Sequence, residues 1–431
     1  MKSWRLGLER EMAITTGVFV ELTEIISDNY FNNYTLSSKV FDFPVLDYQD
    51  VDVTRMQRLC AKLRESAIFG IDQIESADES TTNEDRYWLY LIKGYSYLLA
   101  GENFTGLPLV AGGEVKDWKE NLKSAITDFS KALTYATDSK DVAVAKILIT
   151  RAYYRLGDKT NAVKFANESL SQHNDIVKGV TFDGTNGLNN PAQTYIYGFA
   201  FQPLPRLDFL DPKYFQLYST EQRSIIFAKS EESYLVLAEA MIVDNRLDEA
   251  RSILKSLHNL VKNRPLATVN DQIEKRGAGY TVRYPDNSLY SVAASPGEEF
   301  KAGLILDRKA PNFVQIPYIS GTSVSIEQIN AASSVDSLLE LLYLMRQEIF
   351  FAEGRRVADL GIRLPVAYAE YTTNKSAEPF INAQIPSFIP RNQEMDSFIL
   401  DATNLKVTIK HNMNKVIVQN KNSKYVVPFI N

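Results

Sequence analysis

Cysteine, histidine and tryptophan are scarce in this chain of 431 residues, which has one, three and three of them. The single cysteine, Cys60, excludes a disulfide within the chain and a cysteine-based metal site. Its apolar neighbours recur at helical spacing, so we expect a buried structural thiol. The three histidines, His173, His258 and His411, lie far apart and form no ligand pattern. We therefore expect neither a metal nor another cofactor.

The chain also lacks long apolar runs and an excess of basic residues. No segment reaches the roughly 18 apolar residues that a membrane-spanning helix needs. The charged residues Glu9, Arg10 and Glu11 interrupt the N-terminus before the apolar core of a signal peptide can form. With 47 Lys and Arg against 53 Asp and Glu, the net charge is −6, which argues against nucleic acid as a partner. We expect either a cytoplasmic protein or one whose signal lies outside this sequence.

Motifs of nucleophilic catalysis and nucleotide binding are missing as well. The sequence contains no G-x-S-x-G elbow, no P-loop and no G-x-G-x-x-G after a predicted strand. Glu348 and Asp359 are a tempting acid pair, but on one continuous helix they lie roughly 16 Å apart. Glycosidase carboxyl groups are about 5 to 10 Å apart. The sequence predicts a protein that is not an enzyme.

The clearest element is a helix predicted over residues 338–360, with one apolar stripe and one charged stripe. The charged stripe carries Glu348, Phe351, Arg355 and Asp359, each about one helical turn from the next. We expect both acids to neutralise Arg355 or Arg356 within a buried structural network.

Helical periodicity recurs through much of the chain. We predict helices over 9–31, 51–76, 82–100, 117–136, 140–156 and 158–171, and a helix pair within 231–262. Tyr153, Gly157, Ala162 and Ala166 resemble a tetratricopeptide-type helix pair, and Gly101 is expected to be a left-handed cap after the helix at 82–100. Uneven spacing between such pairs excludes a simple solenoid. The predicted fold is mostly α, with tetratricopeptide-like helix pairs as a scaffold, long irregular loops and a few short β-strands.

We expect one domain over residues 1–431. Its predicted parts are a helical scaffold at about 9–173, 219–263 and 333–361, irregular loops at about 174–218 and 264–332, and a C-terminal segment, 362–431, with short strands at 405–409, 416–418 and 425–427.

Tyrosines and asparagines gather in the loops. Aromatic rings can stack on sugar faces or bind peptide side chains, while Asn and Asp can bind hydroxyl groups. The candidate ligand-binding residues are Tyr30, Tyr34, Tyr195, Tyr197, Tyr280, Tyr284 and Tyr290. The alternative interpretation is that these tyrosines pack the loops onto the helices.

The segment Leu344–Leu360, LMRQEIFFAEGRRVADL, resembles the R-x-E-x-x-F-E-G-x-R-x-x-D-L helix of the SusD/RagB family, which comprises surface lipoproteins of Bacteroidetes that bind nutrients. Segments 95–110, 233–240 and 389–394 resemble further motifs of that family in order and spacing. The resemblance implies a tetratricopeptide-like core and no catalysis. It also makes Phe104, beside the Leu-Pro-Leu turn, a candidate ligand contact. The tail after Glu394 is longer than is usual in the family.

The resemblance further implies a cell-surface protein on the extracellular face of the outer membrane, held by an N-terminal lipid anchor that this sequence does not contain. Our first hypothesis is capture of oligosaccharides and their delivery to a SusC-like TonB-dependent transporter. The alternatives are peptide binding in the RagB manner and a tetratricopeptide-like protein–protein adaptor.

Overall fold

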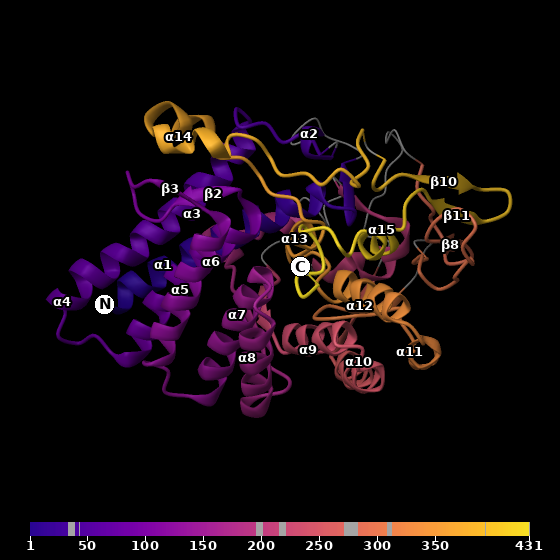
Figure 1. Cartoon of the computed structure of the whole chain (residues 1–431), viewed down its shortest axis with the longest axis horizontal. Helices are drawn as coiled ribbons and strands as arrows, with labels where there is room; N and C mark the ends of the chain where they lie inside the picture. The colour runs from indigo at the N-terminus through magenta and orange to yellow at the C-terminus, as the bar shows by residue number, and fades with distance from the viewer. Residues whose placement is uncertain are drawn as a thin grey trace.

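A computed structural model describes residues 1–32, 39–42, 44–194, 201–214, 221–270, 283–307, 313–392 and 394–430. Helices dominate these residues and the strands are short, so the predicted fold class is confirmed (Figure 1). None of the described helices has the length and apolar character that crossing a membrane requires.

The helices of the first part of the chain mostly begin and end near the predicted ranges, although the one predicted over 9–31 is displaced to 2–26 and residues 30–32 form a strand. They are α1 (Lys2–Ile26), α2 (Lys39–Asp42), α3 (Val51–Phe69), a π-helix (Gly70–Ile74), α4 (Glu75–Ala77), α5 (Asn83–Asn103), α6 (Trp118–Leu133), α7 (Ser139–Leu156) and α8 (Lys159–Gln172). Cys60 on α3 is 1% exposed, and burial raises the pKa of its thiol to about 12. The prediction of a buried structural thiol is confirmed.

Three helix pairs pack along the scaffold: α5–α6, α7–α8, and the pair formed by α9 (Glu231–Val243) and α10 (Leu247–Lys262). A Cβ atom at Gly94 on α5 would lie 2.7 Å from the Phe129 ring on α6, so only glycine allows this close crossing. Gly157 ends α7 in the left-handed conformation, with φ of 76°. The prediction for Gly101 is wrong, because α5 continues to Asn103 and Gly101 instead makes room for Leu122 of α6.

The later helices complete the scaffold. They are α9 (Glu231–Val243), α10 (Leu247–Lys262), α11 (Ile326–Ala331), α12 (Val335–Ile349), α13 (Arg356–Asp359), α14 (Tyr368–Thr373) and α15 (Met413–Gln419), with 3₁₀ segments at Gly184–Asn186, Pro205–Tyr214 (η4) and Lys375–Phe380. Figure 1 shows α12 between α9 and α15, and it contacts both.

The continuous helix predicted over 338–360 is in fact two helices. The chain leaves α12 after Ile349, turns through left-handed residues Ala352 (φ 55°) and Gly354 (φ 70°), and enters α13 at Arg356. The Gly354 N–H donates to the Glu24 carboxylate of α1 over 2.8 Å. Contact with α1 therefore holds a turn that the helical periodicity of the sequence does not reveal.

The strands form small sheets in the predicted loop regions and in the C-terminal segment. Antiparallel pairs join β1 (Tyr30–Asn32) to β5 (Phe201–Pro203), β2 (Gly106–Pro108) to β3 (Val115–Asp117), β4 (Val177–Val180) to β6 (Ile225–Lys229), and β7 (Leu266–Asn270) to β9 (Phe313–Pro317). In the remaining sheet, β11 (Lys406–Ile409) pairs with β10 (Phe398–Asp401) on one side and β8 (Ser291–Ala293) on the other.

The strand predicted at 405–409 is confirmed as β11, whereas those at 416–418 and 425–427 are wrong. Both edges of β11 are already paired, so no further strand can join there. The Asn412 side chain instead accepts from the Lys415 N–H and caps α15, which contains residues 416–418. Residues 425–427 lie in a series of turns.

Candidate functional site

A buried ion-pair network lies where α12, α13, α7 and α9 meet. Arg346 donates to Asp359 over 2.9 Å and to Glu232 over 3.0 Å, and Arg155 lies 2.8 Å from Asp359. Burial raises the pKa of Glu232, but Arg346 and Arg355 outweigh it and lower the pKa to about 2. The charges of this network balance one another inside the core.

The pairings predicted within this network are partly wrong. Glu348 does not neutralise Arg355 or Arg356; it accepts from Thr322 and Ser323 over 2.7 and 2.8 Å. Asp359, the other acid, pairs with Arg346 and Arg155, so neither acid has the partner predicted for it.

Each arginine has another carboxylate instead. Arg355 lies 3.5 Å from Glu232, and Arg356 donates to Asp28 of α1 over 2.6 Å. The network ties α12 and α13 to α9 and to the end of α1.

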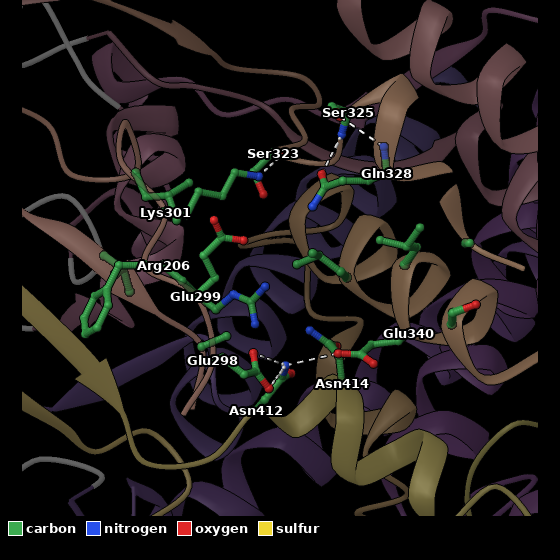
Figure 2. A pocket seen from close by; sticks show the side chains of 18 of the residues that line it. Arg206, Glu298, Glu299, Lys301, Ser323, Ser325, Gln328, Glu340, Asn412 and Asn414 are labelled. Carbon is green, nitrogen blue, oxygen red and sulfur yellow. Dashed lines mark hydrogen bonds between the residues drawn. The ribbon is translucent and has the colours of Figure 1, made fainter. Parts of the chain in front are cut away.

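Beside this network lies a cavity of about 890 Å³. It is bordered by η4, α11, α12, α15 and the segment 292–304, which begins within β8. Figure 2 shows its polar side chains converging from these separate elements. It is our candidate functional site, because it gathers charged, amide and hydroxyl groups that lie far apart in the sequence.

The guanidinium of Arg206 on η4 points into the cavity (Figure 2). The residue is only 9% exposed. Across the described parts of the chain, no carboxylate lies within 4 Å of it and no group accepts a hydrogen bond from it. Burial lowers its pKa, opposed mainly by Glu348. Arg206 therefore presents a positive charge and unused donors to the cavity.

Another wall of the cavity is rich in hydrogen-bond acceptors. The Asn412 side-chain amide donates to Glu298 over 3.3 Å and to Glu340 over 3.4 Å. Lys415 lies 3.4 Å from Glu298. Burial and the neighbouring Glu298 raise the pKa of Glu340.

The buried network holds this wall in place through Asn414, which also lines the cavity. The side-chain oxygen of Asn414 accepts from Arg356 over 2.9 Å, and its side-chain nitrogen donates to Gln347 over 2.8 Å. Gln347 in turn donates to Asp28, the partner of Arg356. Gln347 and Arg356, both in the segment 344–360, thus position α15 against the cavity. This helix belongs to the long C-terminal tail.

Of the aromatic residues predicted to bind ligand, the four that the structure describes do not line the cavity. Tyr30, Phe104 and Tyr290 are at most 3% exposed and pack in the core, so they present no face to a ligand. Tyr30, for example, stacks on Phe351 with ring centroids 4.9 Å apart. Tyr284 is half-buried and donates to Asp208 over 3.1 Å. Tyr34, Tyr195, Tyr197 and Tyr280 lie outside the described residues.

The sequence analysis did not predict the residues that form the cavity. Most of them fall in regions predicted to be loop or tail, whereas Glu340, Leu341 and Leu344 lie on the predicted helix over 338–360. Arg206 and Asn412 carry no local spacing signal. Among the described residues, the aromatic ring that lines the cavity is that of Phe300, which is 37% exposed and lies in the predicted loop region. Over the residues that the structure describes, no three His, Cys, Asp or Glu side chains gather closely enough to hold a metal ion.

Comparison with known proteins finds similarity at the level of structure. No protein-family model and no curated protein matches the sequence. A SusD superfamily protein from Bacteroides fragilis superposes with a TM-score of 0.59 at 13% identity, covering 87% of this chain and 97% of that one. A SusD-like carbohydrate binding protein from Bacteroides vulgatus gives 0.54 at 13% identity, covering 83% and 82%.

A putative sugar binding protein from Bacteroides vulgatus also gives a TM-score of 0.54, at 12% identity, covering 87% of this chain and 96% of that one. These matches extend over most of both chains. The chain therefore has the SusD-like fold.

Proposed function

We propose that the protein binds oligosaccharides in the cavity beside Arg206 without changing them, and passes them to a SusC-like TonB-dependent transporter. The observation that carries this proposal is the convergence of unpaired donors, shared acceptors and one exposed ring in a cavity of about 890 Å³. That volume is in the range of ordinary small-molecule sites, about 300 to 1,000 Å³. Two proteins of similar structure are described as carbohydrate or sugar binding.

The chemistry of the cavity suits a sugar. Hydroxyl groups both donate and accept, so they match a site where Arg206 offers donors and Glu298 and Glu340 offer acceptors. The partly exposed Phe300 can stack on the apolar face of a pyranose ring. A polar site that is not enclosed favours capture and release of a ligand over its tight burial.

Binding without turnover is supported by how the two carboxylates are arranged. Glu298 and Glu340 accept hydrogen bonds from the same nitrogen of Asn412. The amide therefore stands between them, where a glycosidase places the bond to be cleaved.

The test is a calorimetric screen of the protein against neutral and acidic oligosaccharides and against peptides, with chromatography of each bound ligand afterwards. We expect saturable binding of at least one glycan and its recovery unchanged. Phe300→Ala should weaken binding about three- to tenfold, the effect of losing one stacking ring. The matched control is Phe313→Ala, which removes a ring that is 67% exposed and lies outside the cavity.

Binding of peptides alone would contradict the glycan proposal and support the RagB-like alternative, and cleavage of a bound glycan would contradict the absence of catalysis. The transporter and the position on the outer face of the outer membrane are supported by the SusD-like fold. We expect a SusC-like transporter to co-purify with the protein from outer membranes. Co-purification with cytoplasmic proteins instead would support the adaptor alternative.

A further inference from the structure

The inference concerns which glycans the cavity takes, and so it rests on the proposed function. Arg206 is nine-tenths buried, points into the cavity, and has no acceptor or carboxylate partner among the described residues. We propose that the cavity selects glycans that carry an anionic group, a carboxylate or a sulfate, and that the Arg206 guanidinium binds this group through paired hydrogen bonds.

A buried guanidinium without a partner is costly to the folded protein. Removing it from water loses hydration that no internal hydrogen bond or ion pair replaces. The other buried arginines in this region all have such partners: Arg346, Arg355 and Arg356 each contact a carboxylate within 3.5 Å. Arg206 is an exception among them, and a ligand anion is the partner that the cavity can admit.

The nearest buried carboxylate is already satisfied by other groups. Glu348 accepts from the Thr322 hydroxyl, the Ser323 N–H and the Ser323 hydroxyl over 2.7, 2.8 and 2.5 Å. Lys301, also in the lining, donates to the Ser323 carbonyl. The positive charge of Arg206 is therefore balanced only at a distance.

The other charges of the lining decide where the anion can lie. Glu298, Glu299 and Glu340 would repel an anion, and Asn412 places Glu298 and Glu340 on one wall. The anionic group therefore binds at Arg206, while the uncharged hydroxyls of the same ligand lie toward Asn412.

A carboxylate or sulfate uses Arg206 better than a hydroxyl does. Two of its oxygens match the fork of the guanidinium, and each hydrogen bond is charged on both sides. Hydrogen bonds to charged groups are worth enough for a roughly 10- to 100-fold change in affinity when one partner is removed.

The experiment is a binding screen on the full chain with matched glycan pairs: uronic-acid oligosaccharides beside the same compounds with their carboxylates reduced to alcohols, and sulfated oligosaccharides beside their desulfated forms. We expect the charged member of at least one pair to bind about 10-fold or more tightly than its neutral member. The carboxylate and sulfate arms identify which anion is bound. The preference should shrink as salt is raised.

Arg206→Met is the decisive variant, because it keeps a long side chain and removes the charge. It should abolish the preference for the charged member and leave thermal stability equal or higher, since an unpaired buried charge is lost. A loss of stability would instead mark Arg206 as a structural residue and overturn the inference. The matched control, Arg391→Met, alters an exposed arginine outside the lining and should change neither property.

Glu299→Gln provides a test in the opposite direction. Glu299 is exposed and lines the cavity, so removing its negative charge should tighten binding of the charged glycan severalfold. Equal binding of the charged and neutral members by the wild-type protein would overturn this inference and leave the proposed function standing. Binding of no glycan at all would overturn the proposed function itself.

Discussion

Replacing Glu102 by Gln is expected to destabilise the protein strongly, because Glu102 is the carboxylate between two buried arginines. It lies on α5, and one of its oxygens accepts from Arg151 over 2.7 Å and lies 3.3 Å from Arg155. Its other oxygen also accepts from Arg151. Glu102 and Arg151 are each 1% exposed.

The size of the expected loss of stability follows from the arginine charge that the substitution leaves unpaired. Arg155 keeps its contact with Asp359 at 2.8 Å, but Arg151 has no second carboxylate among the described residues. The substitution leaves the Arg151 charge buried and uncompensated. Breaking a buried pair by removing one partner costs about 3–5 kcal/mol, and we expect the free energy of unfolding to fall by that amount.

The assay is urea unfolding followed by circular dichroism and by tryptophan fluorescence, whose transitions should coincide if unfolding is two-state. The matched control is Glu249→Gln, which breaks the exposed pair of Arg246 and Glu249. Their side chains are 50% and 55% exposed, and such pairs are worth about 0–1 kcal/mol. If Glu102→Gln costs no more than this control, the reasoning about the buried network is refuted.

Two further predictions concern pH and packing. Burial raises the pKa of Glu239 to about 7 from its ordinary 4.5, and the hydrogen bond from Tyr154 opposes this rise. Between pH 4.5 and 7 the Glu239 carboxyl therefore stays protonated in the folded state and loses its proton in the unfolded state. Stability should fall as the pH rises from 4.5 to 7. Glu239→Gln should therefore gain about 3 kcal/mol over the wild type at pH 8 and nothing at pH 4, which unfolding curves at the two pH values check. Gly94→Ala should cost about 1–3 kcal/mol, because the new methyl group would press on Phe129. Gly7→Ala, in α1 with open space around it, should gain about 0.5–1 kcal/mol in the same unfolding assay, and an equal effect of both substitutions would contradict the close crossing of α5 and α6.

The helix pairs could be predicted from the sequence because their determinants are local. Apolar periodicity and the glycine at position 157 mark where helices run and end. The break between α12 and α13 could not be predicted, because the periodicity runs straight through it. The left-handed backbone at Ala352 and Gly354 is held by contact with Glu24, which is more than three hundred residues away in the sequence.

The site was predicted less well than the fold, for a related reason. Tyrosine is suited both to binding ligands and to packing in the core. The burial of Tyr30 and Tyr290 shows that composition alone does not distinguish these two roles. The role of Arg206 arises because no described residue pairs with it in three dimensions, which leaves no trace in the sequence. The run Val416–Val418 favours a strand by its residue types, yet the cap at Asn412 makes it part of the helix α15, and Asn412 and Asn414 line the cavity.

The most direct test of the central claim is a crystal structure of the protein with the tightest-binding glycan from the screen. We expect the sugar in the cavity between Arg206 and Asn412, with its anionic group on the guanidinium, an uncleaved glycosidic bond and a ring against Phe300. A glycan bound on another surface, with the cavity beside Arg206 unoccupied, would contradict the account.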